Sequence, residues 1–214
     1  RHLFAISCPD LSYLFALLCP HHPRSTLCPN TTLCRYDSYH VPYNGTGAMM
    51  SQIAFSKSAT KDLFARMGLQ TPAYETHGLK DRDIARLAEQ IFQTFPQPCV
   101  IKPNAGGSSF GVSIAENTKE IETALREVAR LADKVIIEQY IKGCESTCGV
   151  VENMRDEALY ALPPVEIVPT NKFFDYQAKY HGEVDEICPA TFDGKLKTEL
   201  QDIAKTIHRE MGLS

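Results

Sequence analysis

A segment rich in glycine and serine, KPNAGGSSFG at residues 102–111, offers the clearest chemistry in the sequence. Lys102 ends an apolar run, and the loop that follows carries the hydroxyl groups of Ser108 and Ser109. Glycine tolerates the dihedrals that let several backbone N–H groups point at one anion, and a lysine adds a compact positive charge for a phosphate oxygen. The segment is neither a Walker A loop nor a Rossmann fingerprint. It predicts an anion-binding loop, with a flexible surface turn as the alternative.

Two carboxylates lie further along the chain. Glu138 comes near the end of a second apolar run, and Glu145 follows after a short stretch that begins with residues 139–141. A carboxylate or a backbone carbonyl here could accept a hydrogen bond from an adenine amino group, and Glu145 could bind ribose hydroxyls, as acidic residues do in other nucleotide sites. Alternatively, both carboxylates are solvated side chains at the edge of a strand.

An aromatic segment, FFDYQAKY at residues 173–180, brings the ammonium of Lys179 next to the phenol of Tyr180. Aromatic side chains and a lysine near phosphates can cap a pocket and neutralise developing charge. The alternative is an aromatic core segment whose lysine stem lies along apolar surface while its charged end reaches water.

Helices and strands that could position these groups are predicted by hydrophobic periodicity. A strand is expected at 99–103, before the glycine-rich loop, and another at 135–141. The helix predicted at 117–133 opens with Asn117 and carries Glu120 three residues later, an asparagine variant of the capping box. Further helices are expected at 52–67, 81–95 and 196–211, extended chain at 71–75, and antiparallel strands at 147–151 and 158–167. This interspersed pattern predicts an α+β (or α/β) fold.

Composition excludes several classes of protein. The chain has 214 residues and a net charge of −4, which provides no basic surface for nucleic acid or anionic lipid. No apolar run reaches the ~20 residues that a membrane helix needs. The eight cysteines include no C-x-x-C pair, and their spacing with His21 and His22 does not fit a zinc site, so free thiols in a reducing cytoplasm are expected. Because the chain begins with Arg1 and shows no signal-peptide pattern, we expect a fragment.

The motifs together resemble the D-alanine–D-alanine ligases of the ATP-grasp superfamily. The resemblance covers roughly residues 41–214 and rests on the segments VPYNGTG, SQIAFSKSATK, CVIKPNAGGSSFGV, VIIEQYIKGCE, FFDYQAKY and DEICPA. The element FDYQAKY is the one that separates this family from other ATP-grasp enzymes such as biotin carboxylase. The resemblance implies an ATP-grasp fold in which two subdomains grip ATP.

Site residues follow from the resemblance, position by position. Lys57 and Lys102 would contact the α- and β-phosphates, while Ser108 and Ser109 lie in the loop over them. Adenine would be held by Glu138 with Gln139, Tyr140 and Ile141, and the ribose by Glu145. The residues implied in catalysis are Lys179, which reaches the γ-phosphate, and Ser108 and Tyr180, which belong to the loops that close the site.

The implied reaction has two steps. The carboxylate of one D-alanine attacks the γ-phosphate of ATP to give an acyl phosphate and ADP, and the amine of a second D-alanine then displaces phosphate. Positive charge and Mg²⁺ stabilise the transferring group, and loop closure keeps water away from the acyl phosphate. The resemblance further implies a cytoplasmic enzyme of peptidoglycan synthesis, whose full-length form is a homodimer.

Both ends of the chain depart from the family pattern. Residues 1–40 are unassigned and are either a remnant or an atypical start, residues 41–57 would end an N-terminal domain, 58–141 would form the central ATP-grasp subdomain, and 142–214 an incomplete C-terminal one. We expect the Mg²⁺ ligands beyond Ser214 and name no metal residue. On its own the chain is expected to bind ATP weakly at most and to make no dipeptide. A non-catalytic ATP-binding module, or a ligase of D-alanine with D-lactate or D-serine, remain the alternatives.

Overall fold

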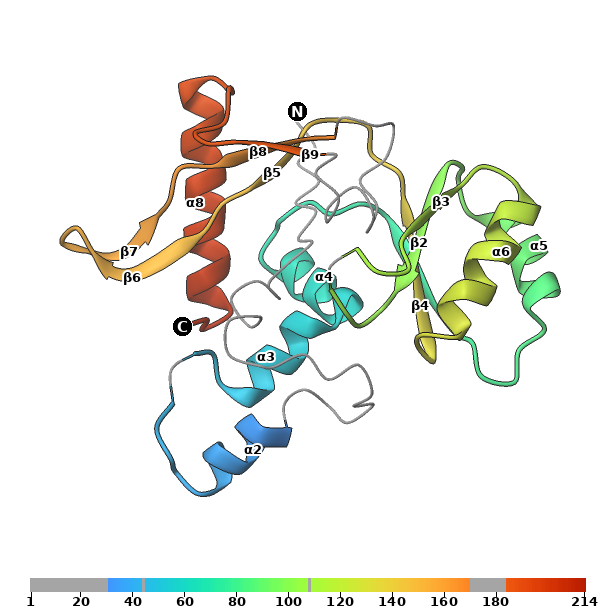
Figure 1. Cartoon of the computed structure of the whole chain (residues 1–214), viewed down its shortest axis with the longest axis horizontal. Helices are drawn as coiled ribbons and strands as arrows, with labels where there is room; N and C mark the ends of the chain where they lie inside the picture. Colours follow the sequence, from blue (N-terminus) through green and yellow to red (C-terminus); the bar gives the residue numbers. More distant parts are fainter. Residues whose placement is uncertain (1–30, 44, 108, 170–183) are drawn as a thin grey trace.

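The computed structural model of the chain describes residues 31–43, 45–107, 109–169 and 184–214. Within these ranges the strands form antiparallel sheets of four, three and two strands, accompanied by helices (Figure 1). The predicted α+β class is therefore confirmed. Predictions about Ser108, Lys179 and Tyr180, and about the cysteines before residue 31, fall outside the described residues. No described helix is both long and apolar enough to span a membrane.

The four-stranded sheet has the order β1-β4-β2-β3, with bounds Tyr74–Gly78, Lys134–Gln139, Cys99–Pro103 and Ser113–Ala115. Strand β4 is central and pairs with β1 and β2 in antiparallel register, so that Glu138 lies opposite both Tyr74 and Val100. Successive side chains of a strand point to opposite faces. Ile101 and Ile137 therefore lie on one face of the sheet, whereas Lys102 and Glu138 lie on the other.

Helices α5 (Ile84–Thr94) and α6 (Thr118–Ala129) cover the first of these faces (Figure 1). The predicted cap of α6 is confirmed, since Asn117 accepts a hydrogen bond from the backbone N–H of Glu120. Helix α5 begins three residues after the predicted start, behind Asp83, which accepts a hydrogen bond from the backbone N–H of Arg86 and was not predicted as a cap. The buried core of the chain lies between these helices and the sheet, and it consists of Leu79, Leu87, Ala88, Ile91, Phe95, Cys99, Ile101, Ala115, Ile121, Ala124, Leu125, Val128, Val135 and Ile137.

The single helix predicted at 52–67 is wrong, because the structure holds two helices there, α3 (Ala48–Phe55) and α4 (Lys57–Arg66). Ser56 separates them in an extended conformation and forms a β-bridge with Ala105. Its hydroxyl also accepts a hydrogen bond from the backbone N–H of Ala59, which is the usual role of serine at a helix N-terminus. Hydrophobic periodicity, which predicted one helix here, does not detect a bridge to a distant loop.

The second half of the chain contains two smaller sheets. Strands β5 (Glu145–Thr147), β8 (Val165–Pro169) and β9 (Val184–Ile187) form one, and the hairpin of β6 (Val150–Met154) and β7 (Glu157–Ala161) forms the other. The strands predicted at 147–151 and 158–167 are thus each divided between two sheets. In the second case, residues 162–164 include two consecutive prolines, which lack the N–H that a sheet ladder needs.

Helix α8 (Gly194–Glu210) lies against the β6–β7 hairpin and makes several polar contacts with it. The ammonium of Lys205 lies 3.0 Å from the carboxylate of Glu157, and His208 Nε2 lies 3.2 Å from Glu152. The side-chain amide of Gln201 donates to the backbone carbonyl of Ala161. Helix α2 (Thr31–Ser38) and the short strands β3 and β9 were not predicted from the sequence.

Shortening one buried side chain of the central strand β4 tests the placement of the core. We expect Ile137→Ala to lower the free energy of unfolding by about 2–5 kcal/mol, because the side chain is fully buried and its removal leaves a cavity. Ile187→Ala deletes the same atoms from an exposed position and should cost less than about 1 kcal/mol. Urea denaturation measures both variants. Equal losses would contradict the placement of the core.

Candidate functional site

An ion pair joins the two central strands of the large sheet on the face that α5 and α6 leave open. Lys102 Nζ lies 2.8 Å from Glu138 Oε2, and only 19% and 8% of the two side chains are exposed. The pair forms because β2 and β4 are antiparallel neighbours and because Lys102 and Glu138 occupy positions of the same face. The structure therefore brings together two residues that the sequence predicted for one nucleotide site.

Helix α4 adds a second lysine to this carboxylate. Lys61 Nζ lies 3.4 Å from Glu138 Oε1, and its side chain is 11% exposed. No hydrogen bond to Glu138 Oε1 is formed with acceptable geometry among the described residues, so this contact is an ion pair. Burial lowers the pKa of the Lys61 ammonium; the nearby charge of Glu138 opposes this effect and that of Lys102 adds to it.

Sequence reasoning did not select Lys61 as a site residue, although it lies in the SQIAFSKSATK motif. The available signal was its spacing from Lys57, because residues four apart share one face of a helix. The role of Lys61 depends on the packing of α4 against the sheet that carries Glu138, and this packing is known only from the tertiary structure.

Glu145 lies at the start of β5, close enough to Lys102 for the two charges to interact. Burial raises the pKa of its carboxyl group, and the positive charge of Lys102 partly opposes the rise. Its Oε2 atom is buried and accepts no hydrogen bond from any described residue. A buried acceptor without a donor is costly unless a ligand supplies one, and sugar hydroxyls are suitable donors.

We call Lys61, Lys102, Glu138 and Glu145 the Glu138 cluster. Its members come from α4, β2, β4 and β5, so the cluster joins the large sheet to the first strand of the three-stranded sheet. After Glu138 the chain leaves the strand, since β4 ends at Gln139. The backbone N–H of Gln139 donates to Ala73 and that of Tyr140 donates to Pro98, so the predicted adenine-binding stretch is fixed at its beginning.

Lys57 has a different environment from that of Lys61. Its ammonium donates hydrogen bonds to the backbone carbonyls of Pro103 and Gly106, both at 2.9 Å. These carbonyls belong to the first residues of the glycine-rich loop. Lys57 therefore contacts residues 103–106, which we call the root of the loop, next to the residues that the sequence assigned to phosphate binding.

Asn104 fastens the same root to α4. Its side-chain oxygen accepts a hydrogen bond from the backbone N–H of Ser58 at 3.0 Å, and its amide nitrogen donates to the hydroxyl of Ser56 at 3.1 Å. Its backbone carbonyl accepts from Lys57 N–H at 2.8 Å. The side chain is buried and caps the first turn of the helix. Asn104 was not selected from the sequence, because its partners are distant in the chain.

The loop itself has backbone conformations that glycine favours. Gly106 has a φ of +120° and Gly111 one of +75°, and Ser109 also adopts a positive φ of +54°. A Cβ atom on Gly111 would lie 2.7 Å from the side chain of Leu131 and 3.1 Å from that of Pro103. The end of the loop thus requires glycine both for its conformation and for its close packing.

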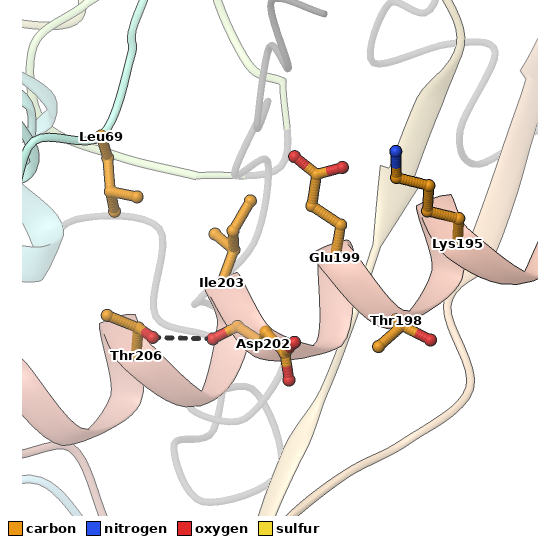
Figure 2. Close-up of a pocket in the computed structure, with 7 residues that line it drawn as sticks. All are labelled: Leu69, Lys195, Thr198, Glu199, Asp202, Ile203 and Thr206. Carbon is orange, nitrogen blue, oxygen red and sulfur yellow. Dashed lines mark hydrogen bonds between the residues drawn. The ribbon is translucent and has the colours of Figure 1, made fainter.

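A separate hollow of about 720 Å³ lies between Leu69 and α8 (Figure 2). Figure 2 shows the side chain of Ile203 pointing toward Leu69, with Glu199 and Lys195 on the preceding turns of the helix. None of the lining residues belongs to the Glu138 cluster, and the charged ones, Lys195, Glu199 and Asp202, are of both signs. Across the described ranges, no group of three or more His, Cys, Asp or Glu side chains is arranged to hold a metal ion.

Comparison with known proteins identifies the family. Residues 63–214 match the family model described as D-ala D-ala ligase C-terminus. The D-alanine–D-alanine ligase of Geobacter sulfurreducens is 33% identical over 177 residues, which cover 81% of this chain and 52% of that protein. The ligase of Desulfotalea psychrophila is 35% identical over 181 residues, covering 83% and 54%. The chain thus spans about half the length of the curated relatives it matches.

Solved structures agree with this result. The VanG D-Ala:D-Ser ligase from Enterococcus faecalis superposes with a TM-score of 0.74 at 26% identity, covering 87% of this chain and 53% of that one. The D-alanine–D-alanine ligase from Bacillus anthracis gives a TM-score of 0.65 at 29% identity, covering 86% and 57%. The fold is therefore that of the ATP-grasp ligases, as the sequence predicted. The chain belongs to the D-alanine–D-alanine ligase family.

The fastening by Asn104 can be tested without a ligand. We expect Asn104→Ala to lower the free energy of unfolding by about 1–3 kcal/mol, because it leaves the buried N–H of Ser58 without an acceptor. Asn104→Asp keeps that acceptor but loses the donor to Ser56, so its loss should be smaller. Urea denaturation at neutral pH measures both. A larger loss for the aspartate variant than for alanine would contradict the assigned hydrogen bonds.

The raised pKa of Glu145 predicts a pH dependence. Above its folded-state pKa the ionised, buried carboxylate opposes folding. The folded state takes up the proton at a higher pH than the unfolded state does, so this penalty decreases as pH falls and is lost below the ordinary pKa of 4.5. Glu145→Gln removes the titrating group. The gain in unfolding free energy of this variant over the unaltered chain should be largest at neutral pH and shrink toward pH 4.5. A gain that grows on acidification would contradict the assigned burial.

Proposed function

We propose that the chain supplies the ATP-binding region of a ligase that joins two D-alanine molecules for peptidoglycan synthesis in the cytoplasm. The observation that carries this proposal is the Glu138 cluster at the root of the glycine-rich loop, where two buried lysines meet one carboxylate. Family membership supports it, because the matched relatives carry the name D-alanine–D-alanine ligase. We further propose that residues 58–141 and 142–214 form two subdomains that grip the nucleotide.

Each described site residue has a role in this proposal. Lys102 binds a phosphate oxygen, and Lys57 holds the loop from which backbone N–H groups reach the phosphates. Glu138 and residues 139–141 face the adenine. The unpartnered oxygen of Glu145 accepts from the ribose. Ser109 belongs to the loop over the phosphates, and the proposal extends to three residues outside the described ranges, which are Ser108, Lys179 and Tyr180.

The reaction proceeds by phosphoryl and then acyl transfer. A carboxylate oxygen of the first D-alanine bonds to the γ-phosphorus of ATP while the bond to ADP breaks. The amine of the second D-alanine then bonds to the acyl carbon, phosphate leaves, and the amine nitrogen loses a proton. The protein holds the reactants in line and stabilises charge, and no side chain forms a covalent bond. Mg²⁺ would accompany the phosphates, but the described residues include no ligand set for it.

A second candidate has one specific observation in its favour. The solved structure with the TM-score of 0.74 is a D-Ala:D-Ser ligase. D-Serine differs from D-alanine by one hydroxyl group, so the two reactions share the ATP chemistry and differ only at the second amino-acid site. An assay that offers both amino acids therefore separates the two candidates.

Nucleotide binding by the 214-residue chain tests the proposed site. We expect NMR titration with millimolar ATP to shift signals of the glycine-rich loop and of β4, and Lys102→Met to weaken binding at least about tenfold through loss of a phosphate contact. Lys134→Met removes a matched charge from an exposed position of the same sheet and should leave binding unchanged. Saturable ATP binding that is indifferent to Lys102 would contradict the site.

Activity is tested on the complete reading frame, obtained by sequencing the nucleotides that flank the codons for Arg1 and Ser214. We expect its product to release ADP only when D-alanine is present and to form the dipeptide, detected by mass spectrometry. An increase in ADP release on addition of D-serine would favour the second candidate. Absence of any amino-acid-dependent ADP release would contradict the proposed reaction.

A further inference from the structure

Glu138 has two lysine counterions that come from different elements. Lys102 approaches Oε2 from the neighbouring strand at 2.8 Å, and Lys61 approaches Oε1 from α4 at 3.4 Å. The charge of Lys102 also acts on Glu145, so Lys102 serves two carboxylates, whereas the ion pair of Lys61 is with Glu138. Burying an additional ammonium is unfavourable in itself, and its burial lowers the pKa of Lys61.

The two lysines differ in what else holds them. Lys61 Nζ also donates to the backbone carbonyl of Pro72 at 3.3 Å and lies 5.3 Å from the centre of the Tyr74 ring. These contacts fix its ammonium against β1 and the chain before it. Lys102 leads into the glycine-rich loop, and among the described residues its ammonium forms an ion pair with Glu138 and also interacts with the charge of Glu145. Lys102 would therefore lose fewer contacts than Lys61 if its ammonium moved toward a ligand.

Phosphate binding by Lys102 would change the balance of charge around Glu138. A phosphate oxygen competes with the carboxylate for the Lys102 ammonium. If Lys102 were the only counterion, each binding event would leave a buried carboxylate unpaired, which is strongly unfavourable. A fixed second lysine removes this penalty, because Glu138 keeps a positive partner whether or not Lys102 turns toward the nucleotide.

We propose that Lys61 is a positioning residue: it is the permanent counterion of Glu138 and thereby frees Lys102 to contact the phosphates. The inference rests on the proposed function, since it assumes that Lys102 meets a phosphate. It also accounts for the position of Lys61 on the same helix as Lys57. One lysine of the helix holds the root of the loop, and the other holds the carboxylate beneath it.

A mutant cycle on the whole 214-residue chain tests this role. The variants are Lys61→Met, Glu138→Gln and the double variant, with Arg66→Met as a control that removes an exposed charge from the same helix. ATP affinity is measured by NMR titration. We expect Lys61→Met to raise the Kd for ATP by roughly tenfold or more when Glu138 is present. In the Glu138→Gln background the same change should have less than about a twofold effect, because a neutral amide needs no counterion.

The alternative roles give different results. An equal loss of affinity in both backgrounds would mean that Lys61 contacts the nucleotide directly or only supports the fold, and would overturn the inference. No loss in either background would also overturn it.

A readout without nucleotide separates this inference from the proposed function. Lys61→Met should lower the thermal unfolding midpoint only when Glu138 is present, and Arg66→Met should not. If this coupling is found but neither the unaltered chain nor the product of the complete reading frame binds ATP, the proposed function fails and with it the release of Lys102. If ATP binds but the coupling is absent from both measurements, the inference alone fails.

Discussion

The structure depends on one buried carboxylate, that of Glu138, which a folded protein can hold only if positive partners reach it. The antiparallel register of β2 and β4 provides Lys102, and the docking of α4 on the open face of the sheet provides Lys61. The requirement for both partners links strand pairing to helix position. A change in register by one residue would turn Glu138 into the apolar core beneath α5 and α6.

Several contacts fix the start of α4, the helix that brings Lys61 to the sheet. The helix begins directly after a bridge between Ser56 and Ala105, and Asn104 caps it from the glycine-rich loop. Lys57 in turn holds the loop carbonyls. The helix and the loop therefore position each other, and a nucleotide that touched the loop would act on the same hydrogen bonds that join these two elements.

Local signals were sufficient for much of this fold. The cap at Asn117, the apolar strand before Lys102 and the run of buried residues in β4 all follow from short patterns of residue type. The motifs also selected Lys102, Glu138 and Glu145, which the structure places in one cluster. Local signals failed where the cause is distant: the break at Ser56 arises from a bridge to the loop, and Lys61 becomes a site residue only when α4 meets the sheet.

A crystal structure of the chain with a non-hydrolysable ATP analogue at millimolar concentration tests the central claim most directly. The account predicts that Lys102 Nζ lies on a phosphate oxygen, while Lys61 Nζ stays within about 4 Å of the Glu138 carboxylate. The adenine should then lie beside Glu138, with the ribose at Glu145. A nucleotide bound elsewhere, or a Lys102 that remains on Glu138 while the phosphates contact Lys61, would contradict it.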